Sequence, residues 1–394
     1  MSLIYLDHNS TTPIDPQVVA AMNEAWNKGF LNPASQHREG QRARREIELL
    51  RTKIIDLLGG LSHSMSADQL IVTSGGTESN NLALIGLAQH LSTKTDNGSK
   101  GRILVSAIEH PSVIGPADAL KRCGFEVEKI SVNSNGVVCL EDLKRRLANT
   151  DSQPVTLVSI MLANNETGVI QPVAEAVKLC HEYSALLHTD AVQMIGKLPV
   201  SFGEIGCDAM SFTAHKLHGP RGIGGLMLKN GIHVEPILFG GFQQMAMRPG
   251  TEDVTLLTGM HRAIELAVGD SDRAARMTQL RDLLESNLQQ RFDVTINGQE
   301  APRMPHTCNV SFNGIDRQAF LMAADIEGLA ISTGSACASG SSEPSPVLLA
   351  MQANNNVVLG SIRISLGATT TRDEIEEALG KISRIVENLL KLRS

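Results

Sequence analysis

Short apolar runs of strand length alternate with segments of helical periodicity along most of this chain, from about residue 16 to residue 255. The run "QLIVTSGG" (69–76) leads into "TESNNLALIGLAQHL" (77–91), and "RILVSAIEH" (102–110) leads into "SVIGPADALKRCG" (112–124). Repeated alternation of this kind predicts an α/β fold with a mainly parallel sheet flanked by helices. Functional residues in such folds gather at the carboxyl ends of the strands, so polar residues at those positions are the first candidates for a site.

The last third of the chain follows a different pattern, which predicts a second, smaller α+β domain. A long helix is expected over residues 260–292, followed by strands at "TCNVSFNG" (307–314) and "SIRISLG" (361–367). An amphipathic helix, "RDEIEEALGKISRIVENLLKL" (372–392), completes this part. The patterns divide the chain into a predicted large domain over residues 16–258 and a predicted small domain over residues 1–15 and 259–394.

The composition argues against several classes of protein. Hydrophobic residues make up 42% and charged residues 20% of the 394 residues, which is ordinary for a globular chain. The net charge of -7 argues against a nucleic-acid-binding surface, which needs clustered Lys and Arg. No apolar run reaches the roughly 18 residues that a membrane span requires. The N-terminus has no basic stretch followed by an apolar one, so no signal peptide is expected and the predicted location is cytoplasmic.

Cysteine usage separates one thiol from the others. The six cysteines contain no Cys-x-x-Cys pair, which predicts neither a disulfide framework nor a zinc site, and no metal site is expected. The stretch "TGSACASGSS" (333–342) surrounds Cys337 with small residues, which favours a thiol on a mobile loop. A Gly/Ser surface loop with an incidental cysteine is the alternative. Five cysteines lie in or near apolar patterns and are expected to be inert: Cys123, Cys139, Cys180, Cys207 and Cys308.

The stretch "TSGGTESNN" (73–81) places two glycines between a predicted strand and a helix that opens at Thr77. Backbone N–H groups and the helix macrodipole make a helix N-terminus an anion site. Gly76 has no Cβ, so a phosphate can approach the backbone closely. An ordinary strand-to-helix turn with Thr77 as the N-cap is the alternative.

Two further motifs follow at predicted strand ends. In "HTDAVQ" (188–193), Asp190 is placed to hold a protonated ring nitrogen, with a turn aspartate as the alternative. In "SFTAHKLHGPRGIGGL" (211–226), Lys216 can form a Schiff base with an aldehyde, with an exposed lysine as the alternative. Together the three motifs offer one partner each to a phosphate, a pyridine nitrogen and an aldehyde. That combination predicts pyridoxal 5′-phosphate as the cofactor.

On these motifs the chain resembles the cysteine desulfurases of the NifS/IscS type, in the class V aminotransferase group of fold-type I pyridoxal-phosphate enzymes. The resemblance runs from residue 5 to residue 367 and implies a large domain with a mainly parallel mixed sheet and a smaller α+β domain. Several of the matching motifs separate the desulfurases from the rest of the group. They are "YLDHNSTTP", "NPASQH", "TSGGTESNN", "EHPSV", "NNETG", "HTDAVQ", "HKLHGPRG", "RPGTED", "GSACASGSSEPS" and "SIRISLG".

The resemblance implies roles for individual residues toward the cofactor. Lys216 resembles the lysine that binds the cofactor covalently and moves the substrate's α-proton, and Asp190 resembles the partner of the pyridine nitrogen. His110 resembles the imidazole that stacks on the ring, with a hydrogen-bonded loop histidine as the alternative. Thr251 resembles a phosphate contact that comes from the other subunit, which implies a homodimer with shared sites. The other implied cofactor contacts are Gly76, Thr77, Asn165, Gln193, Thr213 and His215.

On the substrate side, the resemblance implies that Arg363 grips the carboxylate of L-cysteine, with Asn32 close by. Arg363 lies in an apolar strand pattern, so it is expected either to be paired in the interior or to be exposed on an edge strand. Cys337 resembles the catalytic cysteine, on a loop over about residues 333–345. The expected catalytic residues are therefore Lys216, Cys337 and His110.

The implied reaction converts L-cysteine to L-alanine and passes the sulfur as a persulfide on Cys337 to an acceptor protein. Iron–sulfur cluster assembly, thiolation of tRNA or cofactors, and DNA modification remain open as destinations. The chain stops soon after its last predicted helix, whereas relatives that serve an iron–sulfur scaffold carry a longer C-terminal segment. Selenocysteine lyase and class V aminotransferase activity on the same scaffold are alternatives. A non-catalytic scaffold is an alternative of another class, and the presence of Lys216, Asp190 and Cys337 argues against it.

Overall fold

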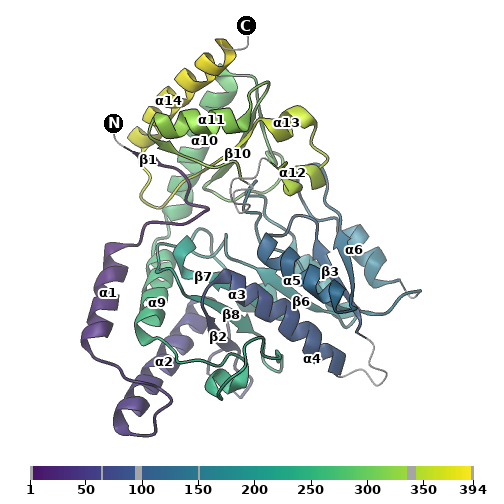
Figure 1. Cartoon of the computed structure of the whole chain (residues 1–394), viewed down its shortest axis with the longest axis vertical. Helices are drawn as coiled ribbons and strands as arrows, with labels where there is room; N and C mark the ends of the chain where they lie inside the picture. The colour runs from purple at the N-terminus through teal and green to yellow at the C-terminus, as the bar shows by residue number, and fades with distance from the viewer. Residues whose placement is uncertain (1–2, 64, 94–99, 150, 335–342, 392–394) are drawn as a thin grey trace.

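The computed structural model describes residues 3–63, 65–93, 100–149, 151–334 and 343–391 of the chain. Figure 1 shows two stacked parts, with the large sheet and its helices below and the C-terminal elements above. The two ends of the chain both lie in the upper part (Figure 1). No helix in the described part of the chain is long and apolar enough to cross a membrane.

The lower part is built on a sheet that, within the described residues, has seven strands in the order β2-β8-β7-β6-β5-β3-β4. Neighbours from β7 to β4 run parallel, whereas β8 runs antiparallel to both β2 and β7. This topology confirms the predicted α/β class with a mainly parallel mixed sheet. The strands are β2 (Gln69–Thr73), β3 (Arg102–Ser106), β4 (Glu126–Ile130), β5 (Val155–Ser159), β6 (Leu186–Asp190), β7 (Ala209–Thr213) and β8 (Gly224–Leu228).

Helices cover both faces of this sheet, because successive strand side chains point to opposite faces. On β8, Met227 packs in one buried cluster, whereas Leu226 and Leu228 pack in another. The first cluster includes residues of α2 (Arg38–Leu57), α6 (Leu140–Leu147), α7 (Val173–Glu182) and α9 (Val254–Gly269). The second includes residues of the π-helical turn η1 (Leu82–Gly86), α4 (Leu87–Thr93) and α5 (Pro111–Arg122). The remaining helices of this part are α1 (Pro16–Asn27), α3 (Gly76–Asn81), α8 (Phe202–Ile205), η2 (Ala214–Lys216) and η3 (Gln243–Ala246).

The upper part has its own buried cluster, formed by two small sheets and three longer helices. In the described residues, β12 (Ser361–Ser365), β10 (Thr307–Phe312) and β9 (Val294–Ile296) form an antiparallel sheet. The N-terminal strand β1 (Ile4–Tyr5) pairs in parallel with β11 (Leu329–Ala330). The three longer helices are α10 (Arg273–Arg291), α11 (Arg317–Ile326) and α14 (Arg372–Lys391). Two short helices, α12 (Pro346–Ala350) and α13 (Asn355–Leu359), contribute Leu348 and Val358 to the lower cluster instead.

The long helix expected over residues 260–292 is two helices, since α9 ends at Gly269 and α10 begins at Arg273. Between them, the Asp270 carboxylate accepts hydrogen bonds from the side chains of Arg273 and Arg276. The predicted boundary after residue 258 falls inside α9, and buried residues on both sides of it pack in the lower core. We propose the break between α9 and α10 as the domain boundary.

Candidate active site

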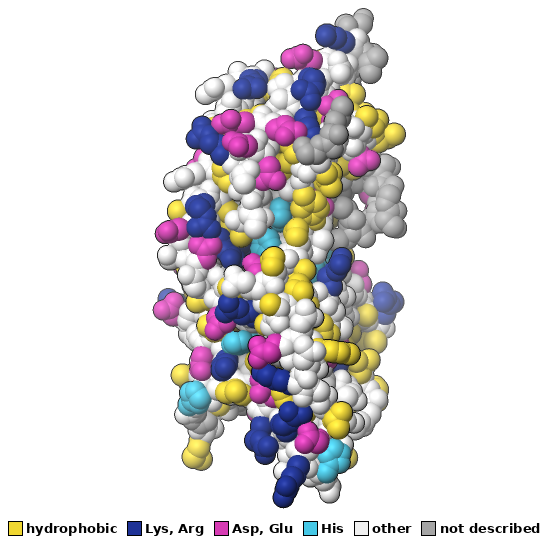
Figure 2. Space-filling model, turned by 90° about the vertical axis from the view of Figure 1, so that its left-hand side faces the viewer, with side chains coloured by type: hydrophobic (Ala, Val, Ile, Leu, Met, Phe, Trp, Pro, Cys, Tyr) yellow, Lys and Arg dark blue, Asp and Glu magenta, His cyan; other side chains and the backbone are white. Residues whose placement is uncertain are grey.

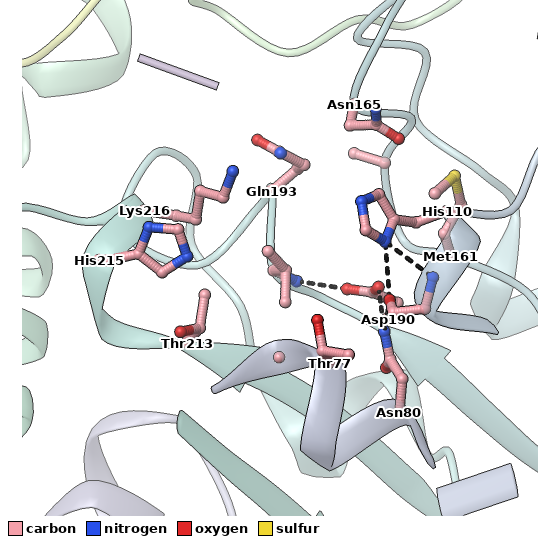
Figure 3. Close-up of a pocket in the computed structure, with 14 residues that line it drawn as sticks. Thr77, Asn80, His110, Met161, Asn165, Asp190, Gln193, Thr213, His215 and Lys216 are labelled. Carbon is pink, nitrogen blue, oxygen red and sulfur yellow. Dashed lines mark hydrogen bonds between the residues drawn. The ribbon is translucent and has the colours of Figure 1, made fainter. Parts of the chain in front are cut away.

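A cavity of about 220 Å³ lies at the carboxyl ends of the parallel strands, and Figure 3 shows the side chains around it. Lys216 and His215 lie on one side of the cavity, with Asp190 and His110 on the other and Thr77 below (Figure 3). The cavity is therefore at the edge of the sheet where the topology of an α/β fold places ligands. Its lining consists of Gly76, Thr77, Asn80, His110, Ser112, Met161, Ala163, Asn165, Asp190, Val192, Gln193, Thr213, His215 and Lys216.

The start of α3 forms one end of the cavity and has the features of an anion site. α3 begins at Gly76 directly after β2, so its first N–H groups have no partner within the helix. A Cβ at Gly76 would lie 2.9 Å from Cγ2 of Val192, which leaves this position to glycine. The nearby Glu78 carboxylate is paired with Arg248, at 2.7 Å and 3.1 Å. That ion pair neutralises an acidic group which would otherwise oppose a phosphate at this helix start.

Asp190 ends β6 and is held firmly in place. Its Oδ2 accepts a hydrogen bond from Nδ2 of Asn80 at 2.7 Å, and its Oδ1 accepts from the backbone N–H of Val192 at 2.9 Å. Asn80 also donates to Oγ of Ser112 at 2.8 Å, which ties α3 to α5. The carboxylate is buried, so a cationic ring nitrogen in the cavity has a fixed, desolvated partner.

His110 is the N-cap of α5, where its Nδ1 accepts a hydrogen bond from the backbone N–H of Ser112 at 3.1 Å. Burial lowers the pKa of His110, against the opposing effect of Asp190, so the ring is neutral at pH 7. Since Nδ1 accepts, the proton of the neutral ring is on Nε2. A neutral ring fixed in this way lines the cavity.

Lys216 follows β7 and reaches the cavity from the short helix η2. Its Nζ donates to the backbone carbonyls of Asn9 and Ser10, the latter at 2.6 Å. The N-terminal segment that pairs with the small domain therefore also contacts the lysine of the large domain. Burial lowers the pKa of the adjacent His215 to about 4, and the charges of Lys216 and Lys197 add to this effect. Because His215 is neutral at pH 7, it adds no positive charge beside Lys216.

Asn9 was not predicted as a site residue, yet it connects both parts of the molecule at the cavity. Its side chain donates to Oγ1 of Thr307 at 3.0 Å and to the carbonyl of Asn165 at 3.1 Å. Its Oδ1 lies 2.7 Å from Nε2 of His306, and its carbonyl also accepts from Gln193 at 3.2 Å. The motif "YLDHNSTTP" contained this residue, but no sequence signal indicated its contacts, which lie 156 to 298 positions away.

Glu109 was also missed, although it directly precedes His110 in a quoted motif. Burial raises its pKa to about 8, in spite of hydrogen bonds from Ser106 Oγ and the Met161 backbone N–H. These two bonds, at 2.5 Å and 2.7 Å, join the loops that follow β3 and β5. Through these two hydrogen bonds, Glu109 holds the backbone next to His110 in place.

Arg363 is buried on β12, which resolves the two alternatives in favour of an interior, paired side chain. Its Nη2 donates to Oδ1 of Asp7 at 2.8 Å and to Oγ of Ser10 at 3.1 Å, and its Nη1 donates to the carbonyl of Asn165 at 3.2 Å. Its Nε is buried and has no hydrogen-bond partner among the described residues. The guanidinium is thus beside the cavity, but Asp7 already pairs with it.

Asn32 and Thr251 lie elsewhere in this chain, where both line a second cavity of about 530 Å³ together with Trp26 and Phe30. Neither residue lines the cavity that contains Lys216 and Asp190. Within one chain the structure therefore brings these two predicted residues together, but it does not bring them to the other predicted site residues.

Cys337 and most of its predicted loop lie outside the described residues. The flanking residues Gly334 and Glu343 line a third cavity, of about 400 Å³, which shares His110 and Asn165 with the first. The ends of the undescribed segment thus lie next to the candidate site. The other five cysteines are all free thiols. Burial raises the pKa of Cys180 to about 12 and also raises the pKa of Cys207 and Cys308, in keeping with inert thiols.

These groups suit pyridoxal phosphate, since the cavity presents an anion site, a buried carboxylate and a lysine amine. In addition, Oε1 of Gln193 is buried beside the cavity with no hydrogen-bond partner in the described part of the chain. The fold and the site together define a pyridoxal-phosphate-dependent enzyme of fold type I.

Comparison with known proteins identifies the family. Residues 4–378 match the family model described as aminotransferase class-V. The chain is 41% identical to cysteine desulfurase IscS of Dictyoglomus turgidum, over 98% of this chain and 95% of the relative. It is 36% identical to cysteine desulfurase IscS 1 of Archaeoglobus fulgidus, over 98% and 97%. The chain therefore belongs to the aminotransferase class-V family, among the cysteine desulfurases of the NifS/IscS type.

Solved structures agree with this assignment. A NifS-like protein superposes with a TM-score of 0.87 at 34% identity and covers 98% of this chain and 100% of the other. A NifS-like protein from Rickettsia africae superposes with a TM-score of 0.87 at 33% identity, over 98% and 99%. These matches confirm the fold-type I architecture that the sequence predicted.

Proposed function

We propose that this protein converts L-cysteine to L-alanine and transfers the sulfur through a persulfide on Cys337. The observation that carries the proposal is the arrangement of the two adjoining cavities. One holds Lys216 and Asp190, and the other is bordered by Gly334 and Glu343, the residues that flank the Cys337 segment. His110 and Asn165 line both cavities, so Gly334 and Glu343 lie beside the cavity that contains Lys216.

Bound pyridoxal phosphate would supply an aldehyde for covalent attachment and a ring that withdraws electrons from the substrate's α-carbon. Asp190 keeps the ring nitrogen protonated, because its buried carboxylate is fixed by Asn80 and Val192. The neutral ring of His110, which lines the same cavity, would pack against the bound ring. The amine of Lys216 takes the proton from the α-carbon and later returns a proton to the product.

The sulfur transfer balances without an external oxidant or reductant. The C–S bond of L-cysteine breaks and an S–S bond forms to the Cys337 sulfur, while the substrate carbon gains a proton and leaves as alanine. One thiol and one cysteine thus become one persulfide and one alanine. An acceptor thiol then attacks the outer sulfur and regenerates the Cys337 thiol.

A direct test is to incubate the purified holoenzyme with L-cysteine and a thiol reductant, and to measure alanine and sulfide. Equal amounts of both are expected from the wild type, and the Cys337→Ala variant should make almost no sulfide. Cys123→Ala is the matched control, because that thiol is exposed and lines neither of the two cavities, and it should behave as wild type. Undiminished sulfide release by Cys337→Ala would contradict the proposal. The same assay with selenocysteine, or with a keto acid as amino acceptor, separates the selenocysteine lyase and aminotransferase alternatives.

We further propose a homodimer in which Thr251 of one subunit completes the phosphate site of the other. Large apolar side chains are exposed near Thr251, with Trp26, Phe239 and Phe242 at 74%, 88% and 92% exposure. Gly240, between the two phenylalanines, lies against Pro249, two residues before Thr251. Such a patch is typical of a surface that another protein chain covers.

Mixing two inactive variants tests the shared site. A heterodimer of Lys216→Ala and Thr251→Ala chains has one site with both residues intact, so activity should appear after the chains are mixed and exchanged. A fully active monomer would rule out the shared site.

The sulfur acceptor is proposed to be a protein of iron–sulfur cluster assembly or of tRNA or cofactor thiolation, in the cytoplasm. Capture of the protein that accepts sulfur from the persulfide would identify the pathway that receives it.

A further inference from the structure

Three metal-ligating side chains meet on the large domain, at a place outside all residues assigned to catalysis. They are His90 on α4 and His233 and Glu235 in the segment after β8, and their candidate ligand atoms lie within 4.8 Å of one another. Nδ1 of His90 lies 3.1 Å from Oε1 of Glu235. The two imidazole rings are 5.0 Å apart between centroids and tilted by 59°. None of the three lines the cofactor cavity.

The backbone around this cluster is fixed by the fold. The N–H of Glu235 donates to the carbonyl of Gly86 at 3.1 Å, just before α4 begins. A Cβ at Gly86 would lie 2.6 Å from the carbonyl oxygen of Glu235, so glycine allows this close approach. Val234 is fully buried in the core beneath α4, and its neighbours His233 and Glu235 flank it. The three side chains therefore come from two separate segments whose backbones are held together by this hydrogen bond and close contact.

We propose that His90, His233 and Glu235 form a Zn²⁺ site, with solvent completing the coordination. Two imidazole nitrogens and one carboxylate oxygen are a preferred ligand set for zinc. Ligand atoms around one tetrahedral zinc ion are about 3.4 Å apart, given metal–ligand bonds of about 2.1 Å. Nδ1 of His90 and Oε1 of Glu235, 3.1 Å apart, already lie close to that spacing. His233 has an exposed side chain, and we expect it to rotate toward the other two ligands when zinc binds.

The position of the cluster suggests a structural consequence of zinc binding. The helix that begins at the anion site near Gly76 continues through η1 into α4, which carries His90. Zinc bound at the cluster clamps this helix to the segment that follows β8. We expect zinc to stabilise the folded chain by mass action, because the unfolded chain does not hold the three ligands together.

The test is Zn²⁺ titration of the full-length holoenzyme in a Cys337→Ala background, which removes the reactive thiol as a competing ligand. Equilibrium dialysis should give one saturable zinc per chain. His233→Ala, at an exposed position, should weaken the affinity at least tenfold, and Glu235→Gln, which preserves the side-chain size, should do the same. His63→Ala is the matched control, since that histidine is exposed outside the cluster and should leave the affinity unchanged.

Thermal unfolding gives a second readout of the same proposal. Zinc should raise the unfolding temperature of the background protein and of His63→Ala, but not that of His233→Ala or Glu235→Gln. Equal zinc affinity in His233→Ala and His63→Ala would overturn the proposal. Absence of saturable binding in the background protein would overturn it as well.

Discussion

The two halves of the active site are built in different ways. The cofactor half stands on the carboxyl ends of β6 and β7 and on the start of α3, all within one sheet core, and Asp190 there has both of its oxygens bonded. The substrate half is assembled from segments of both domains, including Asp7, Asn165 and Arg363. Buried atoms without hydrogen-bond partners occur in both halves of the described site, such as Oε1 of Gln193 and Nε of Arg363, so the two halves differ in which segments supply their residues.

This difference indicates which half is preorganised and which half adjusts. A fully bonded carboxylate in a rigid sheet needs no rearrangement to hold a cofactor ring. Arg363 already pairs with Asp7, so the proposed contact with a substrate carboxylate requires its guanidinium to redistribute its hydrogen bonds. We therefore expect changes in the cofactor half to reduce the rate of chemistry, and changes in the substrate half to affect substrate binding most.

The largest effect is expected from Lys216→Ala, in the cofactor half. Loss of proton transfer alone should lower kcat by about 10²–10⁴-fold, and the cofactor can no longer be held covalently. The absorbance band of the cofactor–lysine linkage should disappear, while the circular dichroism of the fold persists. A normal cofactor band in Lys216→Ala would show that another amine holds the cofactor.

Arg363→Ala tests the substrate half and has a matched control in the same domain. Arg303 forms a buried ion pair with Glu285, at 2.7 Å and 2.8 Å, much as Arg363 pairs with Asp7. Removing either arginine leaves a carboxylate without its cationic partner, so both variants should lose about 3–5 kcal/mol of folding free energy. Only Arg363→Ala should raise KM for L-cysteine strongly, as steady-state kinetics would reveal. A similar KM for L-cysteine in both variants would mean that a residue other than Arg363 binds the substrate carboxylate.

Asn80→Ala sharpens the view that the cofactor half depends on fixed hydrogen bonds. Asn80 acts through Asp190 and Ser112, so its loss should lower kcat by about tenfold with little change in KM, in line with about 1–3 kcal/mol for a lost buried hydrogen bond. Asn80→Asp is a useful contrast, because a second carboxylate beside Asp190 should perturb the cofactor spectrum more. Wild-type kinetics and spectra in both variants would mean that Asp190 is held without Asn80.

The smallest effect is expected on the pH dependence of folding stability. It comes from the buried His188, which lies two residues before Asp190 on β6. Its ring lies between Oγ of Ser159 and Oγ of Ser211, each at 2.9 Å, and burial lowers its pKa to about 3. In the unfolded chain the imidazole of His188 takes up a proton near pH 6.5, whereas in the folded chain it stays neutral at that pH. The lowered pKa of His188 therefore contributes to the free energy of unfolding in a way that favours the folded state above pH 6.5. This contribution is lost as the pH falls toward the folded pKa, by about 2 kcal/mol between pH 7 and pH 5. Urea unfolding of wild type and His188→Asn at both pH values measures this contribution, and an identical pH dependence would exclude it.

The cofactor half could be predicted from sequence because its groups lie in short motifs at the ends of recognisable strands. Asp190 ends β6, Lys216 and Gly76 each lie three positions after the last residue of a strand, and the sheet brings such ends together. Their partners could not be predicted, since Asn80 and Asp190 are 110 positions apart and no pattern links them.

The substrate half depends on contacts that a linear pattern does not encode. Arg363 and Asp7 are 356 positions apart, and their pairing follows from where the N-terminal segment crosses β12. The break between α9 and α10 was missed for a related reason. The hydrogen bonds from Arg273 and Arg276 to Asp270 are visible only in the structure, although the stretch "GDSD" (269–272) does contain Gly and Asp, which are common at helix ends.

The measurement that tests the account most directly is mass spectrometry of the protein after a single turnover with L-cysteine and no reductant. The account predicts that the peptide containing Cys337 gains the mass of one sulfur atom, in step with one alanine per active site. Peptides containing Cys123 and Cys139, the less buried of the other cysteines, should stay unchanged. Alanine formed without added sulfur on Cys337 would contradict the account.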